Sequence, residues 1–189
     1  MKKYFILLVI AAVSFLANAA EITLLDLSVP DWKKSTAVTY PGLSLAASAA
    51  EPGVLVLTAK ISETSAIIRN KAWHGYDFKF ADPLPTGKLV FEFRADTMTT
   101  LWMNAVGKDA EGKLRRLDKP LNMYGSNIVK PGTWCKVEMD MAKSHISGQN
   151  KAGALESVFK LEFRLHPHKY NKPGTYTAEI RNMRYILED

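Results

Sequence analysis

The stretch FKLEFRLH, residues 159–166, decides how this chain folds. A repeat of two residues puts alternate side chains on opposite faces of a β-strand. The apolar set is Phe159, Leu161, Phe163 and Leu165, and the polar set is Lys160, Glu162, Arg164 and His166. The stretch therefore predicts a strand with one face in a hydrophobic core and the other face turned outward.

The same alternation recurs along the chain, and turn signals separate the stretches that carry it. It is clearest in LVFEFRAD at 89–96, TLWMNAVG at 100–107 and CKVEMDM at 135–141. Further strands are predicted at 22–27, 43–48, 54–59, 66–69, 115–120 and 176–187, and one weak helical turn near 152–157. Turns fall at 51–53, 85–87, 109–112, 131–133 and 172–175. Many short strands with turns between them predict an all-β, antiparallel sandwich built as a single domain.

The first twenty residues are typical of a signal peptide rather than of the fold. Lys2 and Lys3 precede an apolar run from Tyr4 to Leu16, and small residues follow up to Ala20. This order matches a secretory signal with a cleavage site of the A-x-A type, and the run is short for a membrane span. We therefore expect residues 1–20 to be removed, residues 21–189 to form the domain, and the mature protein to be secreted or periplasmic with no membrane span.

Charge and cysteine content narrow the function classes. Loss of Lys2 and Lys3 leaves 23 basic and 19 acidic residues, so the formal charge falls from +6 to +4. This small, scattered surplus does not indicate nucleic-acid binding. Cys135 is the one cysteine of the chain, so no internal disulfide can form and stability has to come from packing.

Three segments resemble the jelly-roll carbohydrate-binding modules and the wider galactose-binding-like β-sandwich superfamily. WCKVEMDM at 134–141 looks like their W-x-x-V-x-hydrophobic-D-hydrophobic strand, and GTYTAEIRNMRY at 174–185 looks like their closing strand. Leu25-Asp26-Leu27 followed by Trp32 is similar to their first strand. The resemblance implies a jelly roll in which the N-terminal strand lies against the closing strand, and a carbohydrate as partner.

One position departs from this family pattern. Arg181 stands before Asn182, where the resemblance implies an aspartate that helps to hold a structural calcium in many relatives. A cation site beside an arginine is unfavourable. Asp26, Glu179 and Glu188 could still supply oxygen ligands, so calcium stays an alternative to the absence of any cofactor.

Sugars bind to sandwich faces by stacking on aromatic rings and by hydrogen bonds from planar polar groups. Outward positions of the clearest strands supply such groups at Glu92, Arg94, Trp102, Asn104, Glu162, Arg164 and His166, and we expect loop contacts from Trp73, His74 and Tyr170. The alternative is that Trp102 lies under a loop and that the Glu/Arg pairs are cross-strand ion pairs. Trp32 and Trp134 are assigned to the core.

The sequence favours a non-catalytic carbohydrate-binding domain, and we assign no residue a catalytic role. The alternatives are a polysaccharide lyase or glycoside hydrolase on the same fold, and an envelope protein whose sandwich binds another protein. His166-Pro167-His168 resembles half of a cupin metal site, but the glutamate and the later histidine of such a site are missing from the sequence that follows. Pro167 also favours the end of the strand there.

Overall fold

The fold is taken from a computed structural model of the chain. It describes residues 20–24, 33–34, 43–61, 74–95, 100–122, 132–147, 149, 151–166 and 173–187. Within these ranges every regular element is a β-strand, and all strand pairs are antiparallel. The expected all-β antiparallel sandwich is therefore confirmed.

Sheet A is one of the two layers of this sandwich. In the described part of the chain its order is β3-β4-β13-β6-β9, and β1 pairs with the far end of β13. The strands are β1 (Glu21–Thr23), β3 (Leu43–Ala47), β4 (Val54–Ile61), β6 (Gly87–Ala95), β9 (Cys135–Asp140) and β13 (Gly174–Leu187). Pairing of Ile22 with Tyr185 places the N-terminal strand against the closing strand, as the resemblance implied.

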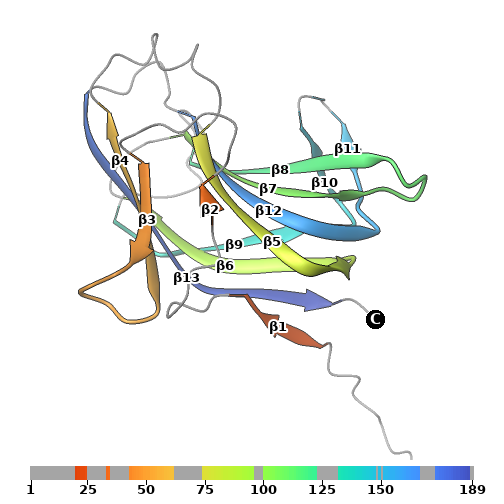
Figure 1. Cartoon of the computed structure of the whole chain (residues 1–189), viewed down its shortest axis with the longest axis horizontal. Helices are drawn as coiled ribbons and strands as arrows, with labels where there is room; N and C mark the ends of the chain where they lie inside the picture. Colours follow the sequence, from red (N-terminus) through yellow and green to blue (C-terminus); the bar gives the residue numbers. More distant parts are fainter. Residues whose placement is uncertain are drawn as a thin grey trace, which may run out of the picture.

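Sheet B is the other layer, with the order β11-β10-β8-β7-β12-β5-β2. Its strands are β2 (Lys33–Lys34), β5 (His74–Pro85), β7 (Thr100–Lys108), β8 (Leu114–Asn122), β10 (Ser144–Ile146), β11 (Ala152–Gly153) and β12 (Ser157–His166). β12, which contains residues 159–166, lies between β7 and β5. Figure 1 shows both layers bending in the same sense, so that the outer face of sheet B lies on the inner side of the bend.

The core fills the space between the sheets with the inward half of each strand. Leu161 and Phe163 of β12, Phe91 and Phe93 of β6, and Met103 of β7 are fully buried in one cluster. Aromatic and aliphatic groups of this size are the main source of burial free energy in a sandwich. The period-two pattern of the sequence therefore predicts the core faces correctly.

Two predictions of local structure are wrong. The predicted helical turn near 152–157 is instead β11 followed by the start of β12. Residues 74–85 form the long strand β5, although their glycine, aspartates and prolines gave no strand signal. Pairing with β12 over most of its length holds β5 in place, which is a tertiary effect that local composition does not show. The strand predicted at 66–69 lies outside the described residues.

A bulge interrupts the closing strand. Arg181 pairs with Glu92 and Arg184 with Val90, so Asn182 and Met183 of β13 together oppose one residue of β6. Asn182 has a φ of 52°, in the left-handed region that asparagine tolerates better than most residues. The bulge leaves Asn182 exposed and directs Met183 into the core.

The predicted signal segment lies almost wholly outside the described residues, which begin at Ala20. Among the residues described, we find no helix with the length and apolar content needed to cross a bilayer. Export remains a prediction from the sequence.

The close approach of β7 to β12 requires a glycine. A Cβ at Gly107 would lie 1.9 Å from the backbone oxygen of Ser157, whereas a Cβ at Gly174 would have no neighbour closer than 3.9 Å. We predict that Gly107→Ala lowers the free energy of unfolding by about 2 kcal/mol or more, because overpacking against backbone cannot relax by a side-chain rotation. Gly174→Ala is the matched control, and urea denaturation of both variants checks the difference. Equal stability of the two variants would contradict the close approach.

Candidate functional site

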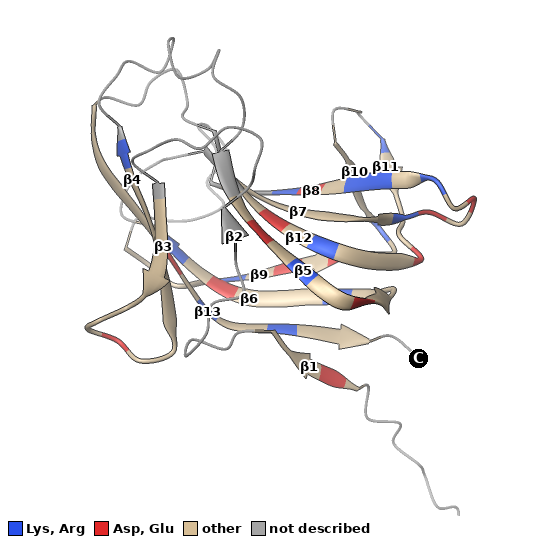
Figure 2. Cartoon of the chain, in the orientation of Figure 1, with Lys and Arg blue, Asp and Glu red and all other residues tan. Residues whose placement is uncertain are grey.

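The outer face of sheet B carries a row of polar side chains across its central strands. Glu162 of β12 is in register with Asn104 of β7 on one side and with Asp77 of β5 on the other, and Asn104 is in register with Asp118 of β8. Figure 2 shows acidic and basic positions lying close together along β5 and β12. Lys160 and Arg116 come from positions two residues before Glu162 and Asp118, and therefore share this face. We call these six residues the polar row.

Glu162 is the electrostatic centre of the polar row. Its side chain is 0% exposed, although it points away from the core. Nζ of Lys160 lies 2.5 Å from Oε1, and Nε of Arg116 lies 3.1 Å from Oε2. A buried carboxylate is costly unless cations and hydrogen bonds compensate it, and both are supplied here. The expectation of Glu162 as an exposed contact is therefore wrong: it is a buried ion-pair partner that fixes two cations at the surface.

Asn104 lies between Glu162 and Asp118 in the register of the sheet and is hydrogen-bonded to Asp118. With its amide nitrogen turned towards β8, Asn104 donates to Oδ1 of Asp118 at 3.2 Å. Burial raises the pKa of the Asp118 carboxyl above its ordinary value of 3.8, while a hydrogen bond with Ser147 and the charge of Arg116 act in the opposite direction. The face therefore combines fixed donors and acceptors with little freedom to rearrange.

Trp102 lies on the same face, one step further along β7. It is half-buried, and its position is in register with Arg164 of β12 and Pro120 of β8. Arg164 and His166 are placed by their backbones at the end of β12, and His74 starts β5 rather than standing in a loop. Trp73 and Tyr170 lie outside the described residues. The structure thus brings Trp102, Asn104 and Glu162 together, and sequence reasoning missed Arg116, Asp118, Lys160 and Asp77.

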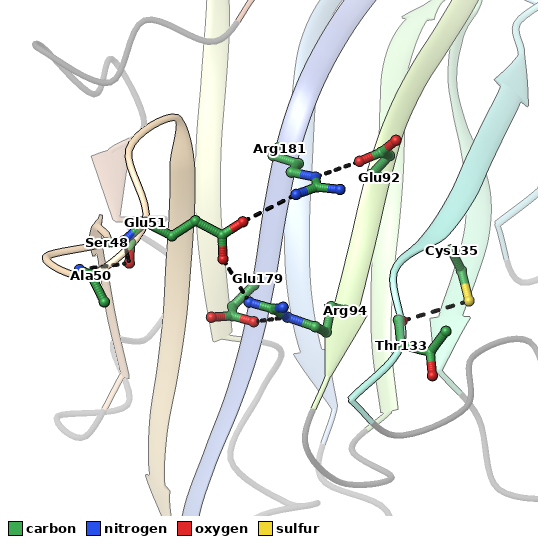
Figure 3. Close-up of polar contacts among 9 residues, drawn as sticks. All are labelled: Ser48, Ala50, Glu51, Glu92, Arg94, Thr133, Cys135, Glu179 and Arg181. Atoms are coloured by element: carbon green, nitrogen blue, oxygen red, sulfur yellow. Dashed lines mark hydrogen bonds and ion pairs between the residues drawn. The ribbon is translucent and has the colours of Figure 1, made fainter.

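Arg94 and Glu92 lie on the opposite side of the molecule, on the outer face of sheet A. Arg94 donates to Glu179 through Nε and to Glu51 through Nη2 at 3.0 Å. Arg181 donates to Glu92 through Nε and to Glu51 through Nη1 at 3.0 Å. Figure 3 shows Glu51 between the two guanidinium groups. Of the candidate contacts, Arg94 and Glu92 therefore do not share a face with Trp102, because β6 and β7 belong to different sheets.

Trp134 belongs to this second group. The guanidinium carbons of Arg94 and Arg181 lie 4.3 and 4.1 Å from the centre of its ring. The side chain is half-buried on the outer face, so its assignment to the core is wrong. The hydrogen bond to Glu179 is the main cause that raises the pKa of the Arg94 guanidinium above its ordinary value. Guanidinium groups stacked on indole and paired with carboxylates form a compact structural cluster.

This cluster does not suit a calcium ion. Glu179, Glu92 and Glu51 are each ion-paired with Arg94, Arg181 or both, so these carboxylates do not converge on a free centre. Within the residues described, no group of three or more acidic, histidine or cysteine side chains could hold a metal. Asp26 and Glu188, the other oxygens considered, lie outside the described ranges. Guanidinium groups thus neutralise the carboxylates that would otherwise be ligands.

Comparison with solved structures shows that the jelly-roll sandwich is shared with carbohydrate-binding modules. The family 11 module of a cellulosomal cellulase of Clostridium thermocellum matches with a TM-score of 0.59 at 14% identity, over 90% of this chain and 96% of that chain. A family 29 module, in a variant complexed with cellulohexaose, matches with a TM-score of 0.51 at 8% identity, over 90% and 92%. An agarase matches with a TM-score of 0.53 at 13% identity, over 89% of this chain and 25% of the agarase. The TM-scores show a common fold, and at these low sequence identities the likeness extends to the fold alone.

Sequence comparison adds nothing to this result. No protein-family profile matches the chain, and no curated protein matches it. The assignment of the polar row therefore rests on its own geometry.

The raised pKa of Asp118 gives a pH test of the polar row. Because its folded pKa lies above the unfolded value, the folded state binds more protons, and the stability contributed by Asp118 is present below pH 3.8 and lost as pH rises through the folded pKa. We predict that Asp118→Asn removes this loss, seen in urea denaturation across that pH range.

Asp109→Asn is the matched control for this measurement, because the pKa of Asp109 is shifted in the opposite direction. Burial alone would raise its pKa, but hydrogen bonds from Arg115 and from the backbone of Lys113 outweigh it and lower the pKa. Its stability contribution therefore has the opposite sign and is lost as pH falls. Parallel pH profiles for the wild type and Asp118→Asn would contradict the assignment.

Proposed function

We propose that this chain is an exported, non-catalytic carbohydrate-binding domain that binds a poly- or oligosaccharide across the outer face of sheet B. The observation that carries the proposal is the position of Trp102 beside a rigid row of planar polar groups. A half-exposed indole offers an apolar surface to the C–H face of a sugar ring. Amide, carboxylate and guanidinium groups beside it can pair with the hydroxyl groups.

The electrostatics of the polar row suit a ligand rich in hydroxyl groups. Lys160 and Arg116 are held by Glu162, and with Asp77 and Asp118 the row sets three carboxylates against two cations, so its net charge is small. Arg116 is 46% exposed and presents guanidinium N–H groups to solvent, and the half-buried Asp118 carries acceptor oxygens. Asn104 is only 5% exposed and acts within the row by its hydrogen bond to Asp118. Groups whose rotamers are fixed before binding lose little entropy when a ligand binds. The fixed side chains of the row therefore favour ligand binding as well as the stability of the fold.

The shape of the sheet and the structural relatives support the same proposal. The outer face of sheet B lies on the inner side of the bend in Figure 1, where an extended chain of sugars has most contact with protein. The structural relatives include a module complexed with cellulohexaose and part of an agarase. We include Arg164, His166, Trp73, His74 and Tyr170 as contacts at the rim of this face. The signal-like N-terminus favours a secreted or periplasmic location, where polysaccharides are accessible.

Binding can be tested with immobilised polysaccharides and affinity measurements. We predict that the protein is retained by at least one glycan of a panel that includes cellulose oligosaccharides and agarose. Trp102→Ala should weaken that binding about tenfold or more, because the lost stacking of the sugar ring on the indole and the lost apolar burial together exceed about 1.4 kcal/mol. Arg116→Ala is a second variant at an exposed position, and Lys60→Ala on the other sheet is the control. Unchanged affinity in Trp102→Ala and Arg116→Ala, or no retention by any glycan, would contradict the proposal.

A glycoside hydrolase on the same face is the second candidate, because Glu162 and Asp118 place two carboxylates on one face with Asn104 between them. A raised pKa, as in Asp118, is what a general acid needs. The pairing of Glu162 with two cations speaks against a nucleophile or base there. Release of reducing ends from a bound glycan, abolished in Asp118→Asn, would establish this candidate instead.

A protein partner recovered without any glycan binding would favour the third candidate, an envelope interaction domain.

A further inference from the structure

The outer face of sheet A contains a cavity of about 470 Å³ that the proposed function does not use. It lies where β1, β13, β6 and β9 run side by side, with the turn between β3 and β4 at one end. Its lining residues are Thr23, Gly53, Val90, Phe91, Glu92, Lys136, Asn182, Met183 and Arg184. Cavities of about 300–1,000 Å³ are the usual size for small-molecule sites.

The bulge in β13 shapes this cavity. Since Asn182 and Met183 together oppose one residue of β6, β13 bends there and Asn182 turns its amide outward. Nδ2 of Asn182 donates to Oε2 of Glu92 at 3.3 Å, and Arg181 donates to the same oxygen. Within the residues that the structure describes, both of these bonds go to Oε2 and leave Oε1 of Glu92 open to a hydroxyl donor. Bulges of this kind often stand beside functional sites because they redirect a side chain.

The cavity wall has a surplus of positive charge. Lys136 is exposed, is in register with Glu92, and has no ion pair within the described part of the chain. Glu92 is paired with Arg181, which lies outside the lining and is shared with Glu51. Arg184 pairs with Glu21 through Nη1 at 3.2 Å; its Nε is buried without an acceptor, but its side chain is 42% exposed. The lining thus carries one ammonium and one partly exposed guanidinium against a single carboxylate that is already ion-paired.

We infer that this cavity is a second binding site, for a sugar that carries a carboxylate, such as a hexuronate. The carboxylate is bound by Lys136 and Arg184, and the hydroxyl groups by Oε1 of Glu92, Asn182 and Thr23. A single surplus cation suits a monoanion rather than a multiply charged phosphate. The buried side chain of Val90, 4% exposed, gives the site an apolar floor for the ring. The inference does not rest on the proposed function, because the two sites lie on opposite sheets.

The test compares D-glucuronate, D-glucose and acetate by titration calorimetry or by NMR titration of the protein. Glucose has the same ring without the C6 carboxylate, and acetate has the carboxylate without the ring. We expect glucuronate to bind best and its binding to weaken with added salt, because the interaction is partly ionic. Equal binding of glucose would overturn anion recognition, equal binding of acetate would overturn sugar recognition, and no binding of glucuronate would overturn the site.

Variants locate the binding. Lys136→Gln is expected to weaken glucuronate binding about tenfold, the usual effect of losing a charge-assisted hydrogen bond. Lys60→Gln, another exposed lysine of sheet A, is the matched control and should leave the affinity unchanged. Trp102→Ala should leave glucuronate binding intact, which separates this site from the face of sheet B. Unchanged affinity in Lys136→Gln, or equal losses in Lys136→Gln and Lys60→Gln, would overturn the assignment.

Discussion

The arrangement of this protein depends on the requirement that each central strand serve two surfaces at once. In β12, Leu161 and Phe163 fill the space between the sheets, while Lys160 and Glu162 stand on the outside. Because the side-chain period of a strand is two, a slip of one residue would place Glu162 in the apolar core and expose Phe163. The core therefore fixes the register, and the register fixes which polar groups meet on the outer face of sheet B.

The two outer faces handle charge in different ways. On sheet B the buried carboxylate of Glu162 holds Lys160 and Arg116 at the surface, and Asp77 and Asp118 bring the row close to neutral. On sheet A the guanidinium groups of Arg94 and Arg181 stack on Trp134 and share Glu51, while Lys136 keeps an uncompensated charge near the cavity. Neutral hydroxyl-rich ligands suit the first arrangement, and an anionic sugar suits the second. One small sandwich can thus offer two chemically distinct surfaces.

Much of the fold and part of the candidate site could be predicted from the sequence. The strands around Phe91, Phe163 and Val137 alternate clearly, and their core-facing residues follow that alternation, although Val90 and Glu162 are buried at outward positions. β5 escaped prediction because its residues have weak strand propensity and it is held by pairing with β12. Arg116 and Asp118 were missed as site residues because the stretch LRRLDKPL gives no signal of which neighbours lie across the sheet. Trp134 looked like a core residue because an indole beside a strand is usually buried, whereas here two arginines cover its ring.

By itself, the sequence determined the class of fold and the inward or outward direction of the best strand positions, since alternation is a local property of each strand. It did not determine which outward rows lie together. Arg94 and Trp102 both lie on alternating strands that are neighbours in the chain, yet β6 pairs in sheet A and β7 in sheet B. That separation depends on contacts between residues far apart in sequence, such as Glu92 with Arg181 and Asn104 with Glu162. Only the tertiary structure could place these outward rows on two opposite faces.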